Sequence, residues 1–186
     1  AHEALARAAR LHAQCGHPRG QARSASYRAL AEYRAGDTAA AAVGFASALK
    51  LAQQCGATDL IVYAAQNLAV SAHQTGDLGQ ALESYERAIG MAVALGDRNT
   101  EAVVRVNLAK LFGDLGLLDR ARLAAEEAER EALKAGLVAL AASAAGVAGE
   151  IALSQGDLAA ARDSFLRSLS RMDDPGAREG LEMSQH

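Results

Sequence analysis

Glycine recurs along this chain with a regular spacing, and that spacing constrains the fold more than any other feature. One set of glycines is spaced 40 residues apart, and a second set lies halfway between its members. The first set is Gly36, Gly76, Gly116 and Gly156, and the second is Gly16, Gly56, Gly96, Gly136 and Gly176. Glycine enters the left-handed conformation that closes an α-helix at the least cost. The spacing therefore predicts a repeat protein whose helices end at these glycines.

Residues that follow the first glycine set predict where the next helices begin and how they pack. Asp37, Asp77 and Asp157 come directly after three of these glycines, where a carboxylate can accept hydrogen bonds from the free amides of a helix start. Further on, three positions spaced four and three residues apart fall on one helix face. They are occupied by Ala41, Phe45 and Ala48; Ala81, Tyr85 and Ala88; Ala121, Ala125 and Ala128; and Ala161, Phe165 and Ser168. This pattern predicts close helix crossings, most of them with one aromatic side chain.

Composition favours an all-α protein with a sizeable core. The 186-residue chain is 51% hydrophobic and 22% charged, about a quarter of its residues are alanine, and only two are proline. Such a composition favours helix over sheet. Helices are expected at about residues 1–15, 21–35, 38–55, 58–75, 78–95, 98–115, 118–135, 138–155 and 158–172. Neighbouring helices form antiparallel hairpins, which stack into a solenoid with one continuous core.

The repeat spacing also predicts the domain organisation. We expect one domain over residues 1–186, composed of a half repeat, four whole repeats and a tail that could start a further helix. These parts are residues 1–15, then 16–55, 56–95, 96–135 and 136–175, then 176–186. The half repeat and the missing initiator methionine indicate a segment of a longer protein, and a processed amino terminus is the alternative.

Charge and hydropathy argue against several classes of partner. The net charge is −3 and the arginines and lysines are interspersed with carboxylates, so the chain lacks the basic stripe that nucleic-acid binding requires. The longest apolar stretch, residues 137–149, is too short to span a bilayer, and no secretion signal precedes it. Cys15 and Cys55 occupy equivalent places in neighbouring repeats, where the spacing between helices makes a direct disulfide geometrically awkward. We expect free, buried thiols and a cytoplasmic location. The alanine- and arginine-rich composition hints at a bacterial source.

No arrangement of residues indicates catalysis, a cofactor or a metal. The serines lack a histidine and an aspartate at a recognisable spacing, and no glycine-rich loop follows a strand. His12, Cys15 and His17 lie close together in the sequence. They lack a fourth ligand, whereas zinc sites usually have a closed set. Surface histidines beside a buried thiol are the favoured interpretation, and the chain is not expected to be an enzyme.

Several stretches resemble the tetratricopeptide repeat. The residues that carry the resemblance are Asn67-Leu68-Ala69 with Gly76-Asp77, Ala81, Tyr85 and Ala88; Asn107-Leu108-Ala109 with Gly116, Ala121 and Ala128; Ala29 with Gly36-Asp37, Ala41, Phe45 and Ala48; and Gly149 with Gly156-Asp157, Ala161 and Phe165. The common unit of this family has about 34 residues. The 40-residue unit here is similar to the repeats of kinesin light chains and of bacterial regulators. The resemblance implies a right-handed superhelical solenoid that binds proteins or peptides.

Two places depart from the family pattern. Arg28 and Glu32 stand where the next two copies have apolar residues, although their spacing of four permits an ion pair on the helix surface. Ala125 replaces the aromatic residue of the third copy, which leaves a volume that Phe112 or a leucine would have to fill. We expect a local shift there without loss of the fold.

The resemblance places the binding surface on the first helix of each pair, which lines the concave face in this family. The repeat register then nominates groove residues for a partner's peptide or helix. They are Tyr27, Tyr33, Tyr63, Gln66, Asn67, Val70, His73, Val103, Asn107, Lys110 and Glu150, with Val147 at one end. The two asparagines could grip a peptide backbone or brace a helix, and the tyrosines could anchor a partner's side chain or pack in the core.

Two functions are consistent with these observations. The first is a protein-interaction scaffold that holds a partner's peptide or helix and performs no chemistry. The second is a regulatory sensor module of a larger signalling or transcription protein, which would change shape when a peptide or small molecule binds. Self-association through exposed repeat ends is a further expectation.

Overall fold

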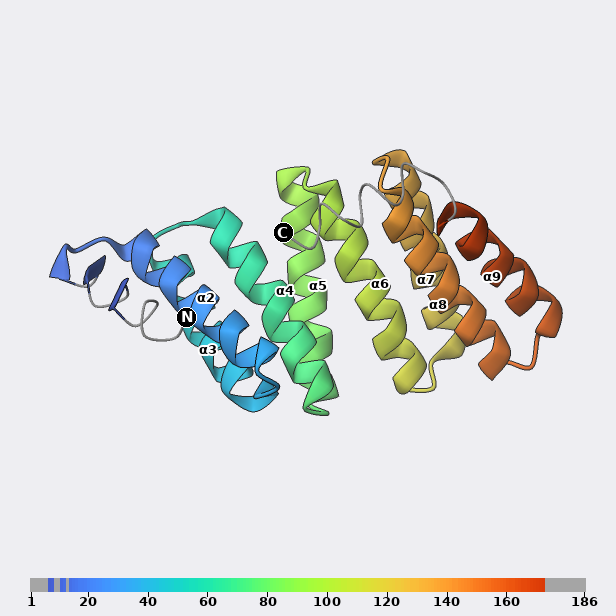
Figure 1. Cartoon of the computed structure of the whole chain (residues 1–186), viewed down its shortest axis with the longest axis horizontal. Coiled ribbons are helices and arrows are strands. Elements are labelled where there is room, and N and C mark those ends of the chain that lie inside the picture. Colours follow the sequence, from blue (N-terminus) through green and yellow to red (C-terminus); the bar gives the residue numbers. More distant parts are fainter. Residues whose placement is uncertain (1–6, 9–10, 13, 173–186) are drawn as a thin grey trace. The chain divides into compact units, whose positions relative to one another are not determined.

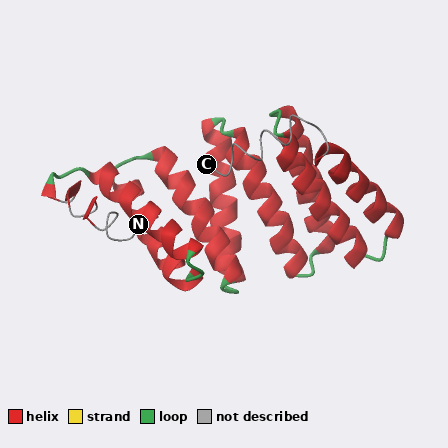
Figure 2. Cartoon of the chain, viewed as in Figure 1, coloured by secondary structure: helices red, strands yellow, loops and turns green. Residues whose placement is uncertain are grey.

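The described part of the chain is entirely α-helical apart from its turns. A computed structural model describes residues 7–8, 11–12 and 14–172, and within them no strand occurs (Figure 2). The long helices follow one another in sequence order (Figure 1). They are α2 (Pro18–Arg34), α3 (Thr38–Gln54), α4 (Thr58–Gln74), α5 (Leu78–Leu95), α6 (Arg98–Asp114), α7 (Leu118–Lys134), α8 (Val138–Ser154) and α9 (Leu158–Met172). This confirms the predicted all-α repeat fold.

The helix boundaries agree with the glycine spacing at nearly every position. From α3 onward each helix begins at the expected residue and ends within one residue of the expected end. Most of the half repeat at 1–15, as well as Gly176 and the tail at 176–186, lies outside the described residues.

Helix α2 begins at Pro18, three residues before the predicted start at 21. Proline suits the first helical turn because its missing amide hydrogen has no partner there. The Nδ1 atom of His17 accepts a hydrogen bond of 2.9 Å from the amide of Gly20 and so caps the helix. The early start therefore follows from a histidine cap, which the sequence interpretation did not consider.

Eight of the nine spaced glycines lie in the described residues, and all eight adopt the left-handed conformation. Their φ angles range from 59° at Gly16 to 86° at Gly36. At the turn after α2, the amide of Asp37 donates to the carbonyl of Glu32 at 3.0 Å, which closes the helix end. Asp37, Asp77 and Asp157 then cap the following helices by accepting from amides three residues later, at 2.9 to 3.0 Å. Both predictions from the glycine register are confirmed.

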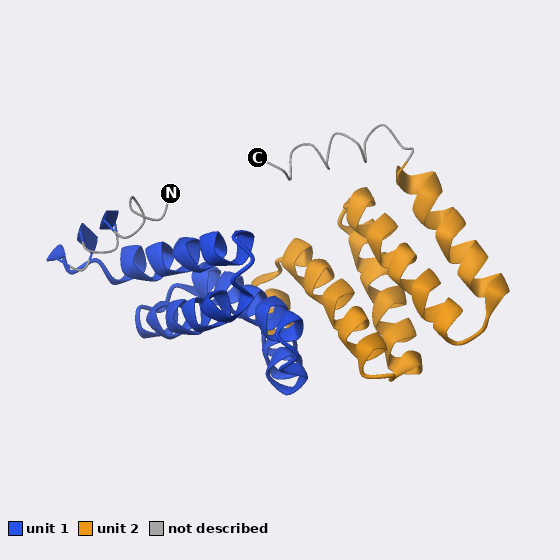
Figure 3. Cartoon of the chain, turned by 60° about the horizontal axis from the view of Figure 1, so that its bottom comes forward, with its two compact units in different colours: residues 1–88 blue, residues 89–186 orange. Residues whose placement is uncertain are grey.

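The chain forms two compact units, residues 1–88 and 89–186, and the boundary falls inside α5 (Figure 3). In unit 1, α3 packs against both α2 and α4, and α2 also contacts α4. The rings of Phe45 and Tyr85 are almost fully buried, as the aromatic positions predict. Helices α2 and α3 cross closely because Gly44 has no Cβ. One built there would lie 2.8 Å from the Cβ of Ala29.

In unit 2, consecutive helices from α6 to α9 pack against one another, and α6 also contacts α8. Helix α8 is rich in alanine and has nine buried residues, which cover more than half of its circumference. The Phe165 ring of α9 lies directly over Gly149, where an added Cβ would come within 2.7 Å of the ring. Small residues thus set the helix spacing in this unit too.

Two expectations about individual residues are wrong. Cys15 is exposed and Cys55 is half-buried, because both follow the last turn of a helix, where few neighbours cover a side chain. They are free thiols, as expected. Val147, nominated for the groove, is buried because α8 is covered on most of its surface. The helices of the described part are not long and apolar enough to cross a membrane.

The close crossing at Gly44 predicts a loss of stability on adding a single methyl group. Gly44→Ala should lower the free energy of unfolding by about 1–3 kcal/mol, since the new Cβ would meet Ala29, whose backbone cannot move freely. Gly90→Ala is the matched control, because Gly90 is exposed in α5 and an added Cβ meets nothing within 4 Å. The control should gain about 0.5–1 kcal/mol from helix propensity. Urea unfolding followed by circular dichroism measures both, and equal effects would contradict the packing argument.

Candidate functional site

Helices α2 and α4 are the first helices of two successive hairpins in unit 1, and a groove lies between them. We call it the tyrosine groove; its volume is about 180 Å³. It is lined by Arg23, Ser26, Tyr27, Asp59, Leu60 and Tyr63. The structure therefore brings together Tyr27 and Tyr63, two of the nominated residues, from neighbouring helices. Tyr27 is 49% exposed, so a large part of its ring is available to a ligand.

Tyr63 lies at the boundary between the tyrosine groove and the core. Its ring meets the buried ring of Phe45 edge-on, with 6.5 Å between centroids. Burial raises the pKa of the Tyr63 hydroxyl above its ordinary value, and the nearby Tyr27 raises it further, while Arg34 acts in the opposite direction. The phenol therefore stays protonated at neutral pH and can donate a hydrogen bond.

Further along the same helices, other nominated residues contact each other or their own helix. The hydroxyl of Tyr33 accepts a hydrogen bond of 2.7 Å from Nε2 of Gln74, which joins α2 to α4. His73 is half-buried, and its ring meets Tyr85 edge-on at 6.2 Å. Burial raises the pKa of Tyr85 far above its ordinary value, and Tyr33 adds to the shift. The carboxyl-terminal ends of α2 and α4 are thus stabilised by aromatic and amide contacts within the protein.

The side chain of Asn67 is partly committed to its own helix. Its Nδ2 donates to the carbonyl of Tyr63 at 2.8 Å, and its Oδ1 remains to accept. This contact favours the bracing interpretation of Asn67, although the brace acts within α4 and not on a neighbouring helix. Gln66 and Val70 are half-buried on the same helix.

In unit 2 the nominated residues lie on α6 and α8. Val103 and Asn107 are half-buried, whereas Lys110 and Glu150 are exposed. Lys110 and Glu150 occupy equivalent positions one period apart, yet neither forms an ion pair with another described residue.

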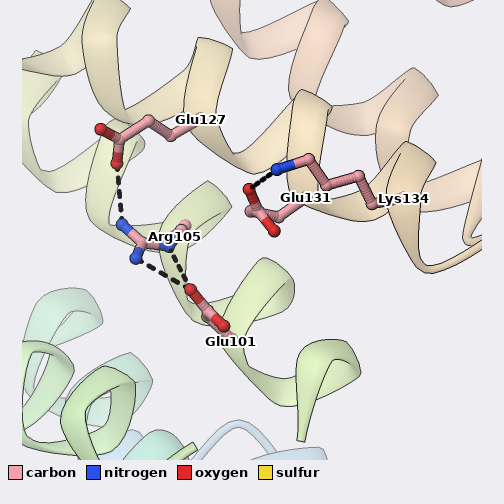
Figure 4. A network of polar contacts seen from close by, with 5 residues as sticks. All are labelled: Glu101, Arg105, Glu127, Glu131 and Lys134. Carbon is pink, nitrogen blue, oxygen red and sulfur yellow. Dashed lines mark hydrogen bonds and ion pairs between the residues drawn. The ribbon is translucent and has the colours of Figure 1, made fainter. Parts of the chain in front are cut away.

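An arginine on α6 connects two helices of unit 2 through its carboxylate partners (Figure 4). Nη2 of Arg105 lies 2.9 Å from Glu101 on its own helix, and Nη1 lies 2.8 Å from Glu127 on α7. On α7, the Nζ atom of Lys134 donates to Glu131 at 2.8 Å. This hydrogen bond is the main reason that the pKa of Glu131 is below its ordinary value. The spacing of four between Glu101 and Arg105 is a signal that could have identified the first pair.

The same spacing did identify the pair on α2. Nε of Arg28 lies 3.7 Å from Glu32, so the surface ion pair that the spacing permits is formed.

A second groove lies in unit 2 on a face where sequence reasoning nominated no residue. It has a volume of about 650 Å³ between α7 and α9, with α8 as its floor. We call it the α7–α9 groove. Its lining consists of Asp119, Arg122, Glu126, Ala148, Ala152, Gln155, Asp157, Ala160, Asp163, Ser164 and Arg167. The sequence does contain a signal for this groove, because alanine stands at positions where the preceding repeat has large side chains.

Comparison with known proteins identifies one repeat directly and the fold as a whole. Residues 62–92 match the tetratricopeptide repeat family. No curated protein is significantly similar to the chain.

Among solved structures, the crystal structure of BtubC (BKLC) from P. vanneervenii is similar, with a TM-score of 0.76 and 23% sequence identity. The similarity covers 91% of this chain and 71% of that one.

The ion pair on α7 predicts a measurable pKa change. Lys134→Gln should raise the pKa of Glu131 toward its ordinary value, because the hydrogen bond that favours the charged form is removed. Carbon-detected NMR titration of the carboxyl group measures this. Since the folded-state pKa is lowered, the stabilisation exists above the ordinary pKa and is lost as pH falls through the folded-state value. Lys110→Gln is the control and should leave Glu131 unchanged. A shift with both variants would point to a general charge effect.

Residues 62–92 are therefore a tetratricopeptide repeat, and the chain has the helical fold that such repeats build.

Proposed function

We propose that the tyrosine groove of unit 1 binds a peptide segment of a partner protein, and that the chain acts as a non-catalytic scaffold. Tetratricopeptide repeats generally mediate protein–protein interaction, and their fold is typically non-catalytic. The observation that carries the proposal is the position of Tyr27 and Tyr63, which line one groove from two neighbouring helices.

The chemistry of the groove suits a peptide with an apolar side chain. Tyrosine rings supply a large contact area at low entropic cost, and their hydroxyls can bond a peptide backbone. Leu60 adds apolar surface, and Arg23, which has no ion pair with another described residue, supplies a charge at the rim. Asp59 is already paired with Arg19 at 2.8 Å, so it offers less to a ligand.

Other nominated residues extend this proposal within each unit. On α4, we assign Gln66, Asn67 and Val70 to the same peptide contact, because they are half-buried beyond Tyr63. In unit 2, we assign Val103, Asn107, Lys110 and Glu150 to a separate contact face on α6 and α8. The two free cysteines support action in a reducing compartment such as the cytoplasm.

Removing one exposed ring tests the proposal. Peptides selected by display on the wild-type chain should bind Tyr27→Ala about 5- to 30-fold more weakly, as expected for truncation of an interface tyrosine. Fluorescence anisotropy gives the Kd. Val43→Ala is the control because Val43 is 72% exposed on α3 and outside the groove. It should leave the Kd unchanged.

Circular dichroism should show that both variants remain helical, since neither residue is buried. Selected peptides that bind Tyr27→Ala as tightly as the wild type would refute the assignment of the tyrosine groove.

A further inference from the structure

Two equivalent positions in unit 2 differ in how their space is filled. In the earlier repeat, the ring of Phe112 on α6 lies beneath the guanidinium of Arg120 on α7, with 4.2 Å between the Cζ atom and the ring centroid. Phe112 is 5% exposed, so the arginine covers its ring. The chain thus places a cation of its own between these two helices.

One period later, both large side chains are missing. Ala152 on α8 stands where Phe112 stands on α6, and Ala160 on α9 stands where Arg120 stands on α7. Ala148 similarly replaces Leu108. All three alanines line the α7–α9 groove. The groove is therefore open because the side chains that fill the preceding repeat have been shortened.

The walls of this groove carry more negative than positive charge. Four carboxylates and two guanidinium groups line it. Both guanidinium groups already have carboxylate partners. Arg122 lies 3.3 Å from Glu126, and Arg167 lies 3.2 Å from Glu129. The lining arginines therefore do not neutralise the remaining carboxylates.

Apart from Glu126, the lining carboxylates have no cationic partner among the described residues. Asp119 accepts a hydrogen bond of 3.2 Å from Nε2 of Gln155, a neutral amide that orients the carboxylate without cancelling its charge. The side chain of Asp163 forms no hydrogen bond or ion pair with another described residue. Asp157, by contrast, accepts from the amide of Ala160 as the cap of α9, so its carboxylate is already engaged. Asp119 and Asp163 are thus the carboxylates available to a ligand.

We propose that the α7–α9 groove binds an arginine side chain on a segment of a partner protein. The guanidinium would occupy the space that Arg120 occupies one repeat earlier and would bond Asp119 and Asp163. Arginine fits better than lysine because its planar fork pairs with carboxylates through two hydrogen bonds and is less strongly hydrated. This surface is independent of the tyrosine groove, so either proposal can fail alone.

The test uses a short alanine-based peptide with two arginines one helical turn apart, and the same peptide with citrulline in place of arginine. Citrulline keeps the shape of arginine but carries no charge. Amide NMR spectra of the full chain, recorded during titration to millimolar peptide, report the site of binding. We expect shifts at Ala148, Ala152 and Gln155 with the arginine peptide, which weaken as salt is added. The citrulline peptide should produce no such shifts.

Two pairs of variants locate the contact. Ala160→Arg supplies an internal guanidinium and should weaken binding about tenfold, whereas Ala159→Arg, one residue away and exposed, should not. The double variant Asp119→Asn, Asp163→Asn should also weaken binding about tenfold. Its control is the double variant Glu83→Gln, Glu86→Gln, which removes two exposed carboxylates outside the groove and should have no effect. Circular dichroism checks that each variant remains folded, and the asparagine variants test the proposal if Ala160→Arg does not fold.

The proposal would be overturned if millimolar arginine peptide produced no shift at the groove, or if the citrulline peptide produced equal shifts. Unchanged binding by the Asp119→Asn, Asp163→Asn variant would also overturn it. So would shifts of the same resonances when only the protein concentration changes. The last result would assign the groove to a second copy of this chain.

Discussion

Close approach of consecutive helices at small residues is the constraint on which the packing of both units depends. In unit 1 the contact is between Ala29 and Gly44, and in unit 2 it is between Gly149 and the Phe165 ring. Alanine makes up most of the fully buried residues of the described chain. Helices that approach so closely leave room for few large side chains. The buried rings of Phe45 and Tyr85 each meet a ring on α4, Tyr63 and His73 respectively. Interiors are packed without voids, which is why one methyl group at such a contact matters.

The fold could be predicted from the sequence because its signals are local. A glycine with positive φ follows each helix end from Gly16 to Gly156. After Gly36, Gly76, Gly96 and Gly156, the next residue is an aspartate that caps the following helix. Where the prediction failed, the deciding interaction was less familiar or not local. The start of α2 depends on an imidazole cap from His17. The burial of Val147 depends on α8 being apolar around its circumference, which removes the contrast between faces from which exposure is usually inferred.

The candidate sites were less predictable than the fold. Repeat register was sufficient to place Tyr27 and Tyr63 on one groove, since neighbouring first helices present equivalent faces. Register could not show that the amide of Asn67 bonds its own helix, because that depends on a choice between side-chain torsions. The α7–α9 groove was missed for another reason. It arises from side chains that are shorter than their counterparts, and a search for chemically active residues does not detect missing volume. Charge is also distributed unevenly between the two units. Residues 1–88 contain eight basic and seven acidic residues, whereas residues 89–186 contain 11 basic and 15 acidic residues.

The eight glycine turns have one further consequence, which concerns how such a chain can change in length. Because every described turn uses the same backbone conformation at the same spacing, recombination that adds or deletes a 40-residue unit in frame leaves each remaining helix with neighbours of the same type. A single-residue insertion within a helix has the opposite effect, since it rotates every later side chain by about 100° and turns the packed face toward solvent. Length variation among relatives of this chain should therefore occur in whole units, while small insertions should be confined to the turns.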